Sequence, residues 1–128
     1  MQQGFVRAAG HDLEYRLIPA HQLNRPTLVF LHEGLGSVAM WRDFPAKVAA
    51  ASGCRTLVYS RYGYGESDLL TEPFGVRYMH DEALQALPEL LDRFAIEAPV
   101  LVGHSDGGSI ALIHAGGAGR AVAGLILM

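Results

Sequence analysis

Four short segments of the chain are continuously apolar and rich in β-branched residues, which is typical of strands buried on both faces of a parallel sheet. They lie at residues 27–31, 56–60, 99–103 and 124–128. Residues 4–8 and 12–18 instead alternate apolar and polar side chains around Gly10 and His11. This second pattern predicts an antiparallel hairpin at the edge of the same sheet.

Helical patterns separate the apolar runs. Apolar residues recur at spacings of three and four over residues 38–48, where Pro45 predicts a kink or two short helices. A second pattern covers residues 80–94, with Pro88 predicting a bend one turn before it, and residues 106–117 predict a short helix that ends in glycines. Strands alternating with helices predict an α/β fold with a mostly parallel sheet, an N-terminal antiparallel hairpin and helices on both faces.

Composition narrows the class of protein. The chain has 128 residues, 50% of them hydrophobic and 18% charged, and a net charge of -3, which is typical of a globular domain without a nucleic-acid or membrane surface. Cys54 is the only cysteine, so we expect no disulfide framework, and no histidines have metal-ligand spacing, so we expect no metal or other cofactor. The first residues lack the pattern of a signal peptide, and we expect a cytoplasmic protein; the oligomeric state is left open.

The sequence G-H-S-D-G at residues 103–107 is the strongest chemical signal. It directly follows a predicted buried strand and directly precedes a predicted helix, the context in which G-x-S-x-G forms a strained turn that exposes a nucleophilic serine. We therefore expect Ser105 to be the nucleophile. The helix that begins there would direct backbone amides toward a developing oxyanion.

Two further loops complete a pattern. F-L-H-E-G-L-G-S at residues 30–37 follows the first apolar run, and S-R-Y-G-Y-G-E-S-D at residues 60–68 follows the second. With the serine motif, these loops resemble the N-terminal half of an α/β-hydrolase, in family order. Glu33 stands where the family has a glycine, and Ser60 and Tyr62 stand where it has Asp and Arg.

The resemblance implies a serine hydrolase that forms an acyl-enzyme on Ser105 and acts on an ester-like or other carbonyl small molecule. It implies that the backbone amides of Gly34, with Leu35 as the alternative, and of Asp106 form the oxyanion hole. Four side chains are expected near the pocket: His32, Glu33, Leu35 and His104. The reaction branch (esterase, carbon–carbon hydrolase, thioesterase or perhydrolase) stays open.

A base for the serine is missing from the expected order of Ser, acid and His. After Ser105 the only candidates are Asp106, at the turn itself, and His114, two to three turns along the helix and out of reach. We therefore expect residues 1–128 to be the N-terminal part of one α/β-hydrolase domain, without its lid and C-terminal strands. Such a chain should be nearly inactive by itself.

Two alternatives belong to other classes. One is an α/β-hydrolase-like binding protein without catalysis. The other is a dinucleotide-binding module, because Gly34, Gly36 and Ala39 spell G-x-G-x-x-A after a strand and Arg61 could meet a 2′-phosphate. The module leaves the serine motif unexplained, and no acidic residue ends the second strand.

Overall fold

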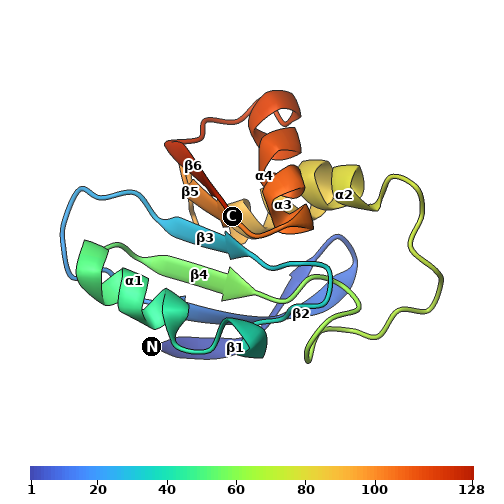
Figure 1. The fold of residues 1–128 in the computed structure, drawn as a ribbon, viewed down its shortest axis with the longest axis horizontal. Coiled ribbons are helices and arrows are strands. Elements are labelled where there is room, and N and C mark those ends of the chain that lie inside the picture. Colours follow the sequence, from blue (N-terminus) through green and yellow to red (C-terminus); the bar gives the residue numbers. More distant parts are fainter.

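A six-stranded sheet forms the centre of the computed structural model, which describes residues 1–128 (Figure 1). Its order is β1-β2-β4-β3-β5-β6, with β1–β2 and β2–β4 antiparallel and the other neighbours parallel. The strands are β1 (Gln2–Ala8), β2 (His11–Ile18), β3 (Leu28–Leu31), β4 (Thr56–Tyr59), β5 (Val100–Gly103) and β6 (Gly124–Leu127). This confirms the predicted hairpin and the mostly parallel sheet.

Helices cover both faces of the sheet, as the sequence predicts. They are α1 (Phe44–Ser52), α2 (Tyr78–Asp81), α3 (Leu87–Arg93) and α4 (Asp106–Gly117), with a short 3₁₀ turn η1 (Ala39–Trp41) and a π-helical segment η2 (Glu82–Ala86). Figure 1 shows α1 on one side of the sheet and α2, α3 and α4 on the other. None of these helices combines the length and apolarity that crossing a membrane requires.

Two cores follow from the alternation of side chains along the strands. Val29 and Leu31 of β3 join the larger core beneath α3 and α4, whereas Phe30 joins the smaller one with Trp41 on the side of α1. All four residues of β3 are buried. The continuous apolar run therefore reflects burial on both faces, as predicted.

The two internal prolines are accommodated differently. Pro45 lies in the first turn of α1, where a proline removes no hydrogen bond of the helix, and η1 and α1 are two separate pieces divided at Arg42, which has φ 54°. Pro88 lies in the first turn of α3, two residues after the end of η2, and the helix over 78–93 is irregular where a bend was predicted. In a π-helix each carbonyl accepts the amide five residues later, so the Ala83 carbonyl would need the amide of Pro88. Proline has no amide hydrogen, and His114 Nδ1 donates to the Ala83 carbonyl instead, at 2.8 Å.

The last apolar run forms a more exposed strand than the other three. Residues 124–128 share the apolar pattern of strands buried on both faces, but Leu125, Ile126 and Leu127 of β6 are 36%, 48% and 46% exposed. The reason is position, since β6 is an outer strand of the sheet and pairs only with β5.

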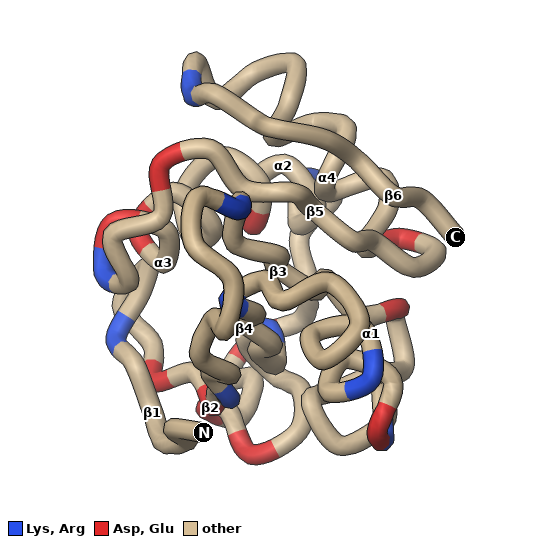
Figure 2. The backbone as a smooth tube through the Cα atoms, turned by 90° about the vertical axis from the view of Figure 1, so that its left-hand side faces the viewer, with Lys and Arg blue, Asp and Glu red and all other residues tan.

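Charged residues of both signs are interspersed along the backbone. Figure 2 shows Lys and Arg positions among Asp and Glu positions, without a continuous stretch of one sign on the side in view. This agrees with the small net charge of -3.

Candidate active site

Ser105 lies on the turn that joins β5 to α4. Its backbone has φ 56° and ψ -120°, a region that L-residues seldom adopt and that costs about 1–3 kcal/mol. The residue is exposed, and α4 begins at the next position. A strained, exposed serine between a buried strand and a helix is the arrangement that activated serines occupy in nucleophile elbows.

Glycines on each side of Ser105 allow this turn to form. A Cβ at Gly107 would lie 2.2 Å from the Leu31 carbonyl oxygen and 2.6 Å from that of His32, and one at Gly103 would lie 2.5 Å from the Gly107 oxygen. These obstacles are backbone atoms that cannot rotate away. The G-x-S-x-G spacing therefore has a steric cause, the close approach of α4 to β3 and β5.

Two segments bring unpaired amides to the same end of the sheet. The loop after β3 contains Gly34, and α4 begins with Asp106; neither backbone amide donates a hydrogen bond within the chain. A Cβ added to Gly34 would lie 3.2 Å from Asp106 Oδ2, so the two segments are in contact. The Leu35 amide is also unpaired, and its side chain is 86% exposed.

The carbonyl oxygen of Glu33 fixes the loop after β3. It accepts hydrogen bonds from the Gly36 amide at 2.9 Å, His32 Nδ1 at 2.6 Å and Arg61 Nη2 at 3.3 Å. Glu33 is absent from the residues with positive φ, so a side chain replaces the family's glycine there without left-handed strain.

His32 is a neutral structural residue. Its Nδ1 donates to Glu33, and its Nε2 accepts the Arg61 backbone amide at 2.9 Å, a pattern that only the neutral ring satisfies. Burial, and secondarily the Arg61 guanidinium, lowers the pKa of His32 from 6.5 to about 4. His32 therefore connects the loop after β3 to the loop after β4.

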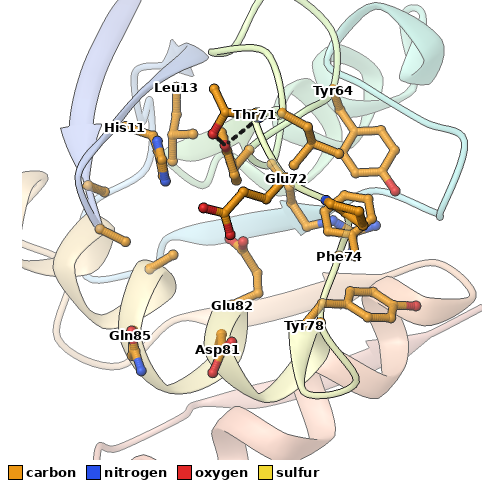
Figure 3. A pocket seen from close by; sticks show the side chains of 18 residues that line it. His11, Leu13, Tyr64, Thr71, Glu72, Phe74, Tyr78, Asp81, Glu82 and Gln85 are labelled. Atoms are coloured by element: carbon orange, nitrogen blue, oxygen red, sulfur yellow. Dashed lines mark hydrogen bonds between the residues drawn. The ribbon is translucent and has the colours of Figure 1, made fainter.

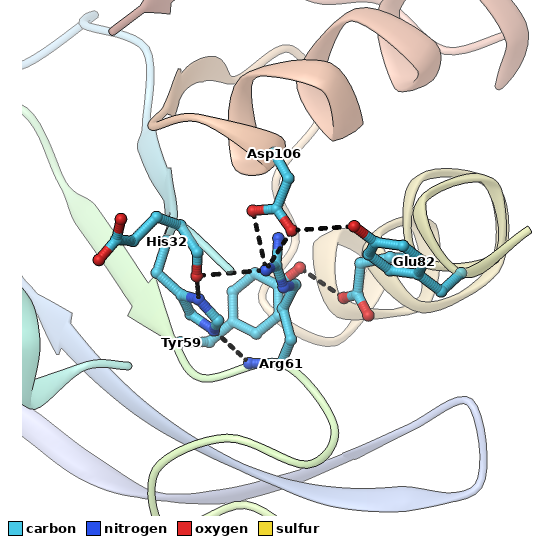
Figure 4. Close-up of polar contacts among 7 residues, drawn as sticks. His32, Tyr59, Arg61, Glu82 and Asp106 are labelled. Carbon is cyan, nitrogen blue, oxygen red and sulfur yellow. Dashed lines mark hydrogen bonds and ion pairs between the residues drawn. The ribbon is translucent and has the colours of Figure 1, made fainter. Parts of the chain in front are cut away.

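Arg61 forms a buried ion pair with Asp106 (Figure 4). Nη2 lies 3.1 Å from Oδ1 and 3.2 Å from Oδ2, with side-chain exposures of 4% and 18% for Arg61 and Asp106. Tyr78 in α2 donates to Asp106 Oδ2 at 3.3 Å, and burial together with that carboxylate raises the pKa of Tyr78. The Asp106 side chain is thus occupied by structural partners and is unavailable as a base.

A cavity of about 360 Å³ adjoins this ion pair (Figure 3). It lies between the β1–β2 turn, the loop after β4 and the helix from α2 to η2. Its lining includes four aromatic and three acidic side chains: Tyr62, Tyr64, Phe74, Tyr78, Glu72, Asp81 and Glu82. Burial raises the pKa of Glu82, whose carboxylate accepts the Tyr59 hydroxyl at 2.7 Å. Arg61 and Tyr78 line the cavity and also bind Asp106, so it is adjacent to the elbow without including Ser105.

The departure at Ser60, in the loop after β4, has a structural explanation. Ser60 Oγ donates to Glu14 Oε1 at 2.6 Å and accepts the Val38 amide at 2.8 Å. Glu14 comes from β2, and it also accepts the Glu66 amide at 3.1 Å. A carboxylate from a neighbouring strand therefore occupies this loop, where the family has an aspartate in the loop itself. The sequence analysis missed Glu14 because its partners are 46 and 52 residues away.

The remaining histidines form no hydrogen bond with the Ser105 side chain. No side chain hydrogen-bonds the Ser105 hydroxyl, and His114 is fully buried with its Nδ1 bonded to the Ala83 carbonyl. His104 is exposed beside Ser105, with its ring 6.2 Å from that of Trp41. The structure thus brings Ser105, Asp106, Gly34, Glu33 and His32 together at the carboxyl ends of β3 and β5.

Comparison with known proteins agrees with this fold. The model of the alpha/beta hydrolase family matches residues 28–128, and the chain belongs to that family. A crystal structure of an alpha/beta hydrolase from Novosphingobium aromaticivorans superposes with a TM-score of 0.82 at 24% identity, over 98% of this chain and 43% of that one.

Curated relatives are similar over most of the chain. A proline iminopeptidase from Saccharolobus solfataricus is 34% identical over 90% of this chain and 36% of its own length. One from Lactobacillus helveticus is 28% identical over 88% of this chain and 37% of its own. The chain therefore spans little more than a third of the relatives it matches.

Proposed function

We propose that the protein is a serine hydrolase that cleaves a carbonyl compound through an acyl-enzyme on Ser105. The observation that carries the proposal is the strained, exposed Ser105 at the start of α4, beside the unpaired amides of Gly34 and Asp106. An alpha/beta hydrolase fold can hold many activities, so the function is argued from this site and not from the fold.

The chemistry assigns one role to each group. Ser105 Oγ bonds to the substrate carbonyl carbon while its proton passes to a base, and the carbonyl oxygen becomes an oxyanion that accepts the amides of Gly34 (or Leu35) and Asp106. When the carbonyl re-forms, the leaving group departs with that proton, and water later releases the acyl group by the same steps. We propose that the base and its acid partner come from outside these 128 residues.

Two substrate types are the first to test. The first is an activated ester, whose leaving group departs with little assistance, so that its hydrolysis reports any acyl transfer at Ser105. An N-terminal prolyl amide is the second, since the curated relatives at 34% and 28% identity are named proline iminopeptidase. A small-molecule carbonyl substrate is common to both.

The main competitor is a binding protein without catalysis. The observation in its favour is that no side chain of these residues hydrogen-bonds the Ser105 hydroxyl. A dinucleotide-binding role has less support, because the Arg61 side chain is 4% exposed and already paired with Asp106.

Fluorophosphonate labelling of the complete protein separates these functions. The reagent forms a covalent bond with an activated serine, and we expect one label, at Ser105, that Ser105→Ala abolishes. Ser109→Ala is the matched control, because Ser109 is an exposed serine one turn further along α4. A label that survives Ser105→Ala, or an unlabelled complete protein, would contradict the proposed function.

A further inference from the structure

One side chain touches both segments that carry the candidate oxyanion donors. Arg61 Nη2 donates to the Glu33 carbonyl at 3.3 Å and to both oxygens of Asp106 at 3.1 and 3.2 Å. Glu33 precedes Gly34 in the loop after β3, and Asp106 is the first residue of α4. The guanidinium therefore bridges two elements that β3 and β5 deliver separately.

The bond to Glu33 acts on the Gly34 amide through the peptide plane. The Glu33 carbonyl and the Gly34 N–H belong to one peptide unit, which is planar and trans, so they point in opposite directions. Holding the Glu33 oxygen consequently fixes the direction of the Gly34 N–H. His32 Nδ1 and the Gly36 amide bind the same oxygen, but only Arg61 connects it to α4.

The bond to Asp106 acts on the second donor. The candidate donor is the Asp106 backbone amide, whereas the carboxylate of the same residue is held by Arg61 and by Tyr78. The carboxylate also lies 3.2 Å from where a Cβ of Gly34 would be, so it fills the space between the two segments. A change in the ion pair would shift the spacing of the two amides.

We infer that Arg61 is a positioning residue that sets the direction and spacing of the Gly34 and Asp106 amides toward an oxyanion. The inference rests on the proposed function and adds to it a residue that touches neither substrate nor nucleophile. It also explains why a residue of this charge is almost completely buried at the end of β4. Simple neutralisation of Asp106 would not require the additional bond to Glu33.

A boronic acid tests this inference in the complete protein. Its boron bonds to Ser105 Oγ as the serine proton is released, and the tetrahedral adduct directs a hydroxyl toward the oxyanion donors. Arg61→Met combined with Asp106→Asn removes both charges of this ion pair together, and it retains the Asp106 backbone amide. Arg7→Met combined with Asp12→Asn is the matched control, because it removes an ion pair of the same length, 3.1 Å, that is 59% and 55% exposed.

We expect the Arg61/Asp106 double variant to bind the boronic acid about 100-fold more weakly, the typical loss for a displacement of about 1 Å. The KM of an uncharged ester should change less than about threefold, because ground-state binding does not use the oxyanion donors. The Arg7/Asp12 variant should match the unmodified protein. Thermal unfolding of each variant reports stability separately.

Two results would overturn the inference. The first is a double variant that binds the boronic acid within about threefold of the unmodified protein, while Ser105→Ala has lost that binding. This result refutes the positioning role of Arg61 and leaves the proposed function intact. Binding that survives Ser105→Ala refutes the proposed function itself. If the double variant fails to fold, Arg61→Lys is tested in its place. The lysine ammonium reaches one of the two partners at most, so we expect its affinity for the boronic acid to be about 10-fold lower. An unchanged affinity would refute the inference.

Discussion

Gly107 offers the sharpest test of how the elbow is built. In Gly107→Ala the new methyl group would lie 2.2 Å from the Leu31 oxygen, where real contacts are at least 3.0 Å, so α4 and β3 must separate by about 0.8 Å. The Leu31 oxygen also accepts the His104 amide at 3.1 Å, a bond that this movement weakens. Overpacking costs about 1–3 kcal/mol and a lost hydrogen bond about 1 kcal/mol, so we expect a loss of about 3 kcal/mol.

Gly116→Ala is the matched control for this substitution. Gly116 lies in the same helix, and its added methyl group would have nothing within 4 Å. Alanine at an exposed helical position should stabilise the protein by about 0.5–1 kcal/mol. Urea unfolding followed by circular dichroism measures both variants. If Gly107→Ala unfolds within about 1 kcal/mol of Gly116→Ala, the close approach of α4 to β3 does not explain the glycine.

Three more predictions follow from the site. Ser105→Gly should raise the free energy of unfolding by about 1 kcal/mol, because glycine tolerates φ 56°. A lower free energy of unfolding, measured by urea unfolding, would argue against backbone strain at Ser105. The pKa of His32 is about 4 when folded and 6.5 when unfolded, so stability is complete above pH 6.5 and falls as pH drops toward 4. Urea unfolding should show about 2 kcal/mol lost between pH 7 and pH 5 that His32→Gln does not lose; equal losses would contradict this. The 128-residue chain should hydrolyse an activated ester on the order of 10⁶-fold more slowly than the complete protein, and comparable turnover would mean that these residues hold a base.

The sequence predicted those parts of the fold that depend on neighbours along the chain. The runs at 27–31, 56–60 and 99–103 are unbroken because both faces of their strands are buried, and this leaves a local signature. The elbow was predictable for the same reason, since strand, glycine, serine and helix are contiguous. The run at 124–128 has the same local pattern, and its greater exposure follows from its place as an outer strand of the sheet.

The polar part of the site depends on contacts between distant residues. Arg61 binds Asp106 across 45 residues, and Ser60 binds Glu14 across 46. Neither pair has a spacing that a single sequence reveals. The one available signal was the position of Arg61, a charged residue directly after a buried strand. In the sequence this arginine was considered as a partner for a phosphate, whereas in the structure its partner is a carboxylate.

Steric and polar constraints therefore have different consequences at this site. Gly103 and Gly107 make room for the elbow, and filling that room moves whole elements, so substitutions there should first appear in the free energy of unfolding. Arg61 and His32 instead hold the Glu33 carbonyl, and Arg61 also holds the Asp106 carboxylate. If that division is right, a variant that exchanges the Arg61–Asp106 pair for a neutral one can keep the fold and still lose affinity for a tetrahedral adduct. A nucleophile elbow alone would then be insufficient for the proposed function, because the Gly34 and Asp106 amides would also need Arg61 to fix their direction.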